Sequence, residues 1–167
     1  MTIRVLVADD QAMIRGALAG LLDLERDIEV VAQAADGAQA LDELARLASA
    51  DAPAHASAPV DVAIIDVEMP RMDGITATQA IRERFPGVRV LIVTTFGRPG
   101  YLQRALDAGA TGFMVKDAPV EALADGVRTV AAGGRAIDQS LALEALSAGS
   151  SPLTDREADV LREVEGG

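Results

Sequence analysis

The sequence predicts an α/β domain in which helices cover both faces of a parallel sheet, and three observations lead to this fold class. Short apolar runs recur along the chain, as is typical of strands buried on both faces. Between them lie segments of about 10–14 residues whose apolar positions repeat with helical spacing. Because the two kinds of segment alternate, consecutive strands are expected to be joined by right-handed crossovers that each contain a helix.

Five strands and five helices follow from this alternation, with Asp36 as a candidate cap of the second helix. Their number and order favour a flavodoxin-like (βα)5 three-layer sandwich with strand order 2-1-3-4-5, which reverses between the first and third strands. The expected strands are residues 3–8, 28–32, 60–65, 88–94 and 111–116. The expected helices are residues 11–24, 38–47, 75–84, 99–108 and 120–132.

The segments outside these elements are of two kinds. Residues 48–59 are rich in Ala, Ser and Pro, which predicts an exposed loop, and His55 inside it is interpreted as a solvated side chain. Near the C-terminus, Thr154 and Glu157 form a capping box that opens an amphipathic helix. One such helix cannot bury its own apolar face, so it is expected to begin another domain. The predicted parts are a main domain at 1–133, a linker with a short helix at 134–152, and the first helix of an incomplete domain at 153–167.

Composition excludes several classes of function. The 167 residues include no cysteine, so neither a disulfide framework nor a cysteine zinc site is expected. No apolar stretch approaches the ~20 residues of a membrane span, and the N-terminus lacks a signal-peptide pattern, so a cytoplasmic protein without membrane contact is expected. The net charge of −11 argues against binding of a nucleic-acid backbone by these residues, since such binding depends on clustered Lys and Arg.

Ionisable and hydroxyl side chains stand at the ends of four predicted strands. The pair Asp9-Asp10 follows the first strand, Asp66 the third, Thr94 ends the fourth and Lys116 ends the fifth. Taken singly, each has an ordinary interpretation as a helix cap, an Asx turn, a β-branched strand residue or a solvated lysine. In an open α/β sheet, however, the carboxyl ends of the strands border one ligand-binding crevice, so their joint placement favours a site.

The expected chemistry of this crevice is that of a phosphoryl group. Three carboxylates repel one another, and their pKa values would be raised unless a cation neutralised them. Mg2+ is the expected cofactor because it binds oxygen ligands and combines one or two carboxylates with a phosphate oxygen. A metal ion, a lysine and a hydroxyl together would hold a phosphoryl group. Asp66 would then be a nucleophile that forms an aspartyl phosphate.

The same residues give a resemblance to a known family. Asp66 is followed by Met69-Pro70-x-Met72-Asp73-Gly74, and Lys116 is preceded by Gly109-Ala110-x-Gly112-Phe113. With these motifs, residues 3–132 resemble the receiver domain of bacterial two-component response regulators. The resemblance implies a phosphorelay protein that is not an enzyme.

The resemblance also implies a role for each site residue. Asp66 would be the phosphoacceptor, which takes a phosphoryl group from the phosphohistidine of a partner sensor histidine kinase. Lys116 would pair with the phosphoryl group, Thr94 would be the switch hydroxyl and Phe113 the aromatic switch residue. The implied Mg2+ ligands are Asp10 and Asp66 directly, Asp9 mainly through water, and the main-chain carbonyl of Glu68.

The C-terminal segment carries a second resemblance. Leu153-Thr154-x-Arg156-Glu157-x-x-Val160-Leu161 is similar to the start of a LuxR-type helix-turn-helix domain, which is typical of the NarL/FixJ subfamily. This implies a transcription regulator that forms a homodimer on phosphorylation. DNA binding would belong to a domain that lies mostly beyond Gly167, and residues 1–133 would be the receiver domain.

Three other functions are open alternatives. One is a Mg2+-dependent phosphatase or phosphotransferase with an aspartyl nucleophile, of the haloacid-dehalogenase kind, although such enzymes place Asp-x-Asp after the first strand. Another is a nucleotide-binding flavodoxin-like module, which would need glycines where Asp9-Asp10 stand. The third is a receiver-like binding module that works without phosphorylation.

Overall fold

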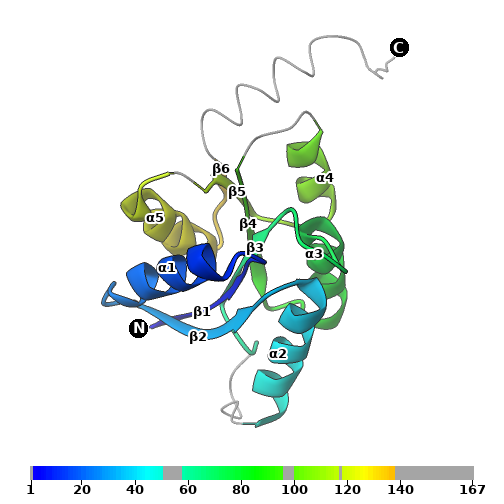
Figure 1. Cartoon of the computed structure of the whole chain (residues 1–167), viewed down its shortest axis with the longest axis horizontal. Helices are drawn as coiled ribbons and strands as arrows, with labels where there is room; N and C mark the ends of the chain where they lie inside the picture. Colours follow the sequence, from blue (N-terminus) through cyan, green and yellow to red (C-terminus); the bar gives the residue numbers. More distant parts are fainter. Residues whose placement is uncertain (1, 51–57, 96–99, 117, 138–167) are drawn as a thin grey trace.

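The structure is a computed structural model that describes residues 2–50, 58–95, 100–116 and 118–137. Its centre is a sheet in which every pair of neighbouring strands is parallel, in the order β2-β1-β3-β4-β5-β6 (Figure 1). The strands are β1 (Ile3–Ala8), β2 (Ile28–Ala34), β3 (Val62–Asp66), β4 (Arg89–Thr94), β5 (Gly112–Val115) and β6 (Ala136–Ile137).

Helices cover both faces of the sheet (Figure 1). On one face lie α1 and α5, and on the other lie α2, α3 and α4. The helices are α1 (Ala12–Asp23), α2 (Gly37–Ala50), α3 (Gly74–Arg84), α4 (Tyr101–Asp107) and α5 (Val120–Ala131).

Successive residues of each strand point to opposite faces, which divides the core into two apolar clusters. Ile64 of β3 packs in the cluster beneath α1 and α5, whereas Ile65 packs in the cluster beneath α2, α3 and α4. Both side chains are fully buried, and burial of such a side chain contributes about 1.5–3 kcal/mol. This central strand is apolar on both faces up to Asp66, which is therefore held at the end of the most deeply packed part of the sheet.

The predicted flavodoxin-like fold and the order of the first five strands are confirmed. The structure adds a sixth strand, β6, within the segment predicted as a linker. After α5, Gly133 has a φ of 95°, and the main-chain N–H of Ala136 then donates to the carbonyl of Thr111 at 3.1 Å. A left-handed glycine turns the chain back toward β5. Two paired residues are too few to leave a periodic signal in the sequence.

The second helix is longer than predicted. It continues to Ala50, so the predicted loop at 48–59 begins with helix, because alanine extends a helix at little cost. The predictions for His55 and for residues 138–167 lie outside the described residues. None of the helices in the described ranges is long and apolar enough to cross a membrane.

Candidate functional site

The predicted site residues meet at the carboxyl edge of the sheet. Asp9 follows β1, Asp66 ends β3, Thr94 ends β4 and Lys116 follows β5. The ladder keeps these ends level, since Asp66 pairs with Val93 and the main-chain N–H of Lys116 donates to the carbonyl of Thr94 at 2.8 Å. The strand order reverses between β1 and β3, which is where a ligand-binding crevice opens in sheets of this kind.

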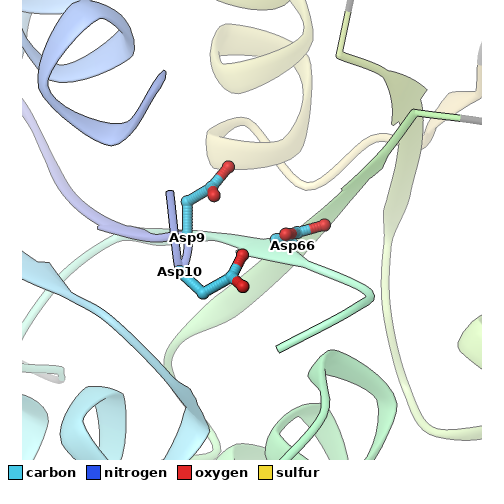
Figure 2. A group of neighbouring side chains, drawn as sticks. All are labelled: Asp9, Asp10 and Asp66. Carbon is cyan, nitrogen blue, oxygen red and sulfur yellow. The ribbon is translucent and has the colours of Figure 1, made fainter. Parts of the chain in front are cut away.

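Three carboxylates converge in this crevice (Figure 2). Asp9, Asp10 and Asp66 each place a carboxylate oxygen within 4.8 Å of the other two. Asp9 and Asp66 are buried and Asp10 is exposed, so the cluster is open to solvent on the side of Asp10. Oxygen atoms at this spacing suit a divalent cation that prefers oxygen ligands, such as Mg2+.

Lys116 supplies the positive charge of the cluster. Its Nζ lies 2.7 Å from Asp9 Oδ2 and 3.1 Å from Asp66 Oδ2, and its side chain is 11% exposed. Burial disfavours the charged ammonium, but the two carboxylates outweigh burial, and the pKa of Lys116 is raised above its usual value. The ammonium is therefore charged at neutral pH.

The pKa of the Asp66 carboxyl is subject to opposing effects. Burial raises its pKa, the Lys116 ammonium lowers it and the Asp9 carboxylate raises it again, with a net pKa above the usual aspartate value. Its Oδ2 accepts a hydrogen bond from Lys116, and its Oδ1 accepts the main-chain N–H of Glu68 at 3.3 Å. The single ammonium does not fully offset the cost of burying this carboxylate, which a further cation would reduce.

Asp9 is fixed in place without capping α1. Its Oδ1 accepts the main-chain N–H of Gln11 at 2.9 Å, and its carbonyl accepts Nη1 of Arg15 at 2.8 Å. The N-cap residue of α1 is Gln11, so the helix-cap interpretation of the acidic pair is wrong. Asp9 Oδ2 is buried and accepts no aligned hydrogen bond from any described residue, although Lys116 is near it. A buried oxygen in this state fits a site that a cation completes.

The loop after β3 passes directly beside Asp66. The main-chain N–H of Gly74 donates to the carbonyl of Val67 at 2.8 Å, which folds the loop back on the strand end. Glycine is required at this position because a Cβ would lie 2.1 Å from the main-chain oxygen of Asp66. The loop carries Glu68, whose N–H contacts the Asp66 carboxylate. The role of the Glu68 carbonyl as a metal ligand stays a prediction.

The two predicted switch residues lie on neighbouring strands. Thr94 is buried at the end of β4, one residue beyond the ladder partner of Asp66. Phe113 is fully buried on β5, pairs with Ile92 of β4 and packs in the cluster beneath α2, α3 and α4. The structure thus places the Thr94 hydroxyl and the Phe113 ring on adjacent strands. The switch roles of the two residues stay predictions.

A hollow of about 500 Å3 lies beside the acidic cluster, between the β3–α3 loop and α4. Asp10 and Glu68 line it from the side of the cluster, and Tyr101 and Arg104 line it from α4. The Arg104 guanidinium lies over the Tyr101 ring, 5.7 Å from its centroid. The hollow therefore borders the cluster on its exposed Asp10 side.

One ion pair beside the site was not found from the sequence. Asp36 caps α2 as predicted, but its second carboxylate oxygen also forms an ion pair with Arg71 in the β3–α3 loop. The two residues are 35 positions apart and both lie in turns, so neither periodicity nor spacing indicates the contact.

Fold and site together define a class of protein: a flavodoxin-like domain whose carboxyl edge holds three acids and a buried lysine. The chain belongs to the response regulator receiver domain family, whose sequence model matches residues 5–128. It is similar to the transcriptional regulatory protein DesR of Bacillus subtilis, with 40% identity over 165 residues that cover 99% of this chain and 76% of DesR.

Comparison with solved structures also identifies response regulators as similar to this chain. The receiver domain of the putative response regulator NarL from Mycobacterium tuberculosis is 33% identical, with a TM-score of 0.69 over 79% of this chain and 98% of that one. A two-component response regulator of the LuxR family from Aurantimonas sp. SI85-9A1 is 26% identical, with a TM-score of 0.76 over 88% of this chain and 97% of that one. The chain is thus a receiver domain of two-component response regulators of the transcriptional-regulator type, and the phosphatase alternative is not favoured.

Proposed function

We propose that Asp66 is the phosphoacceptor of this receiver and takes its phosphoryl group from the phosphohistidine of a sensor histidine kinase. The observation that supports this most directly is the position of the Asp66 carboxylate. One of its oxygens lies within 4.8 Å of a carboxylate oxygen of both Asp9 and Asp10, and its Oδ2 lies 3.1 Å from the ammonium of Lys116. We propose no turnover of a separate substrate by this chain.

In the proposed phosphoryl transfer, a P–N bond of the phosphohistidine is replaced by a P–O bond to Asp66. A carboxylate oxygen of Asp66 attacks the phosphorus of the phosphohistidine, a P–O bond forms and the P–N bond breaks. The histidine nitrogen keeps the electron pair of the broken bond and takes up a proton. Lys116 stays within reach of the transferred group and offsets part of its charge.

The acidic cluster would hold Mg2+, with Asp10 and Asp66 as direct ligands, Asp9 acting mainly through water and the Glu68 carbonyl as the main-chain ligand. When bound, the ion supplies positive charge that makes a phosphoryl group tolerable among carboxylates. The convergence of three carboxylates and the buried Asp9 oxygen without an aligned hydrogen bond both support a cation at this point.

Phosphorylation would act through Thr94 and Phe113. In the proposed switch, the Thr94 hydroxyl moves to bind a phosphoryl oxygen, and the Phe113 ring changes rotamer into the space that Thr94 leaves. This would reshape the surface formed by α4, β5 and α5. Phosphorylation biases the switch only by its differential interaction with the two conformations, so some active-like population exists before it.

The proposed output is homodimerisation that controls transcription. Support comes from α1 and its C-cap residue Leu24, which expose large apolar side chains to solvent, with Met13 at 89% and Leu24 at 77% exposure. An exposed apolar surface of this kind marks an interaction site. DNA binding is proposed for a LuxR-type helix-turn-helix domain that begins at 153–167, linked by 134–152 to the receiver at 1–133.

Intact-mass measurement after treatment with acetyl phosphate tests the phosphoacceptor. We expect the wild-type chain to gain the mass of one phosphoryl group in the presence of Mg2+ and little without it. Asp66→Asn should gain none. Undiminished label on Asp66→Asn would place the phosphoacceptor elsewhere and overturn the proposal.

A further inference from the structure

The loop at residues 67–73 joins the strand of Asp66 to α3 and is tied down at both ends. At its start, the N–H of Val67 donates to β4 at 3.1 Å, and at its end Asp73 caps α3 with a hydrogen bond of 2.7 Å. Between these points lies Glu68, whose N–H bonds the Asp66 carboxylate at 3.3 Å. Glu68 thus lies in the part of the loop between these two fixed points, where its N–H faces Asp66.

The middle of this loop has an unfavourable backbone conformation. Arg71 has a φ of 64°, the one positive value at a non-glycine residue in the described ranges. In this left-handed region the Cβ of an L residue crowds the backbone, so the surrounding structure has to hold Arg71 there. The guanidinium of Arg71 forms an ion pair with Asp36, the residue that precedes α2.

The backbones of the two segments also touch at this junction. The N–H of Gly37 donates to the carbonyl of Met72 at 3.1 Å. A Cβ on Gly37 would lie 2.8 Å from both Cγ and the carbonyl oxygen of Met72, so the approach requires glycine. The ion pair and this hydrogen bond join the same two turns, at consecutive positions on each.

Asp36 has more contacts than a helix cap needs. Capping uses one oxygen, and Oδ1 accepts the main-chain N–H of Gln39 at 2.9 Å. The other oxygen, Oδ2, is directed to Arg71. The Asp36 side chain is 0% exposed, whereas the Arg71 side chain is 65% exposed, so the fixed member of the pair is the aspartate. The hydrogen bond from Gln39 and then Arg71 hold the pKa of Asp36 below its usual value, which keeps it charged.

We propose that Asp36 is a positioning residue for the phosphoacceptor site: through Arg71 it sets the path of the 67–73 loop and so the placement of Glu68 beside Asp66. This inference rests on the proposed function, because its consequence is expressed in Mg2+ binding at Asp66. The side-chain hydrogen bond and ion pair of Asp36 go to Gln39 and Arg71 and not to the acidic cluster. Asp36 acts from α2 on a loop that would supply a main-chain ligand, in the way that outer residues orient metal ligands.

The first test is the Mg2+ dissociation constant of the whole chain, measured by calorimetry for the wild type and Asp36→Asn. Asparagine keeps the size and the Oδ1 acceptor of the cap but removes the charge that holds Arg71. We expect Mg2+ to bind about 10-fold more weakly, at the low end of the effect of removing outer-shell partners. Asp27→Asn is the matched control, since Asp27 pairs with Arg128 of α5 on the opposite face of the sheet. It should leave Mg2+ binding unchanged, and an equal loss in both variants would overturn the proposal.

A double-mutant cycle separates positioning from general loss of structure. Arg71→Asn keeps a residue that tolerates the left-handed conformation and removes the guanidinium. If Asp36 acts through Arg71, Arg71→Asn alone weakens Mg2+ binding, and adding Asp36→Asn weakens it little further. A full additional loss in the Arg71→Asn background would show that Asp36 acts by another route and would overturn the proposal.

A metal-free readout distinguishes failure of this inference from failure of the proposed function. Absence of Mg2+ binding by the wild-type chain would count against the proposed site at Asp66 itself. In Mg2+-free buffer, amide hydrogen exchange at Glu68 and Gly37 is expected to be about 10-fold faster in Asp36→Asn than in the wild type or Asp27→Asn, because the junction opens more often. Unchanged exchange at these two amides would overturn the positioning role whatever the metal data show.

Discussion

The ammonium of Lys116 donates a hydrogen bond of 3.1 Å to Asp66 Oδ2, although 50 residues separate the two in the sequence. The same ammonium lies 2.7 Å from Asp9, so one positive charge faces two buried carboxylates and the exposed Asp10 nearby. The local charge is therefore negative even with Lys116 ionised. A divalent cation would offset this negative charge, which is why the proposed function places Mg2+ beside the added phosphoryl group.

Lys116→Met tests the part that the ammonium plays. Methionine keeps most of the apolar stem and removes the charge, so the fold is expected to persist while the phosphoryl group loses its ammonium partner. We expect phosphorylation by acetyl phosphate to be about 100-fold slower, the effect of removing one donor from a preorganised anion site. The measurement is the initial rate of mass gain at saturating Mg2+.

Circular dichroism provides the control for this variant. Lys116 is the only lysine of the sequence, so no other lysine can take its place in the variant. A wild-type rate in a folded Lys116→Met chain would mean that the ammonium does not serve the reaction. Loss of the folded state would instead identify it as a structural lysine.

Asp66→Asn is expected to stabilise the Mg2+-free chain at neutral pH. Burial raises the pKa of Asp66, so the folded state binds a proton more readily than the unfolded state. Between the unfolded pKa near 3.8 and the raised folded pKa, the free energy of unfolding of the wild type therefore falls as pH rises. Above that window the wild type carries the full penalty, and we expect the asparagine variant to be more stable by about 1 kcal/mol.

Urea unfolding at a series of pH values measures this difference. The gap between Asp66→Asn and the wild type should open as pH rises through the window and stay constant above it. Mg2+ should reverse the order, because at ten times its dissociation constant it stabilises a binding-competent chain by about 1.4 kcal/mol. A gap that opened on acidification instead would contradict the raised pKa.

The position of the site could be predicted because it follows from the topology of the sheet. Asp9, Asp66 and Lys116 each lie where an apolar run ends, and parallel strands bring such ends to one edge. No knowledge of side-chain contacts was needed to expect them together, and the structure places them within hydrogen-bonding or ion-pair distance. The fold class followed from the same alternation of strands and helices.

Contacts between turns were not predictable in this way. The Arg71–Asp36 pair depends on a left-handed backbone at Arg71 and on the approach of two loops, neither of which leaves a periodic pattern. The strand β6 was missed for a related reason, since its two residues pair only because Gly133 redirects the chain. Short elements defined by tertiary contact carry too little local signal to be read from a sequence.

Dimerisation is tested at α1. Beryllofluoride with Mg2+ stands in for the phosphoryl group, and we expect light scattering to show a doubled mass for the wild type. Met13→Lys should stay monomeric under the same conditions, because Met13 is 89% exposed and a lysine there would place charge in the apolar surface. Gln79→Lys, on an exposed position of α3, is the matched control and should dimerise normally. Equal masses for all three chains in the presence and absence of beryllofluoride would contradict phosphorylation-linked dimerisation.

Two glycines should respond to alanine in opposite directions. A Cβ at position 74 would lie 2.1 Å from the main-chain oxygen of Asp66, so Gly74→Ala has to push the loop away from the strand end, and we expect a loss of about 3 kcal/mol. A Cβ at position 20 of α1 meets nothing within 4 Å, so Gly20→Ala should stabilise the chain by about 0.5–1 kcal/mol through helix propensity. Urea unfolding of the Mg2+-free chains gives both values. The close approach of the first residue of α3 to Asp66 would be contradicted if Gly74→Ala were as stable as the wild type. Gly20→Ala is the control that measures the effect of the alanine substitution where a Cβ meets no neighbour.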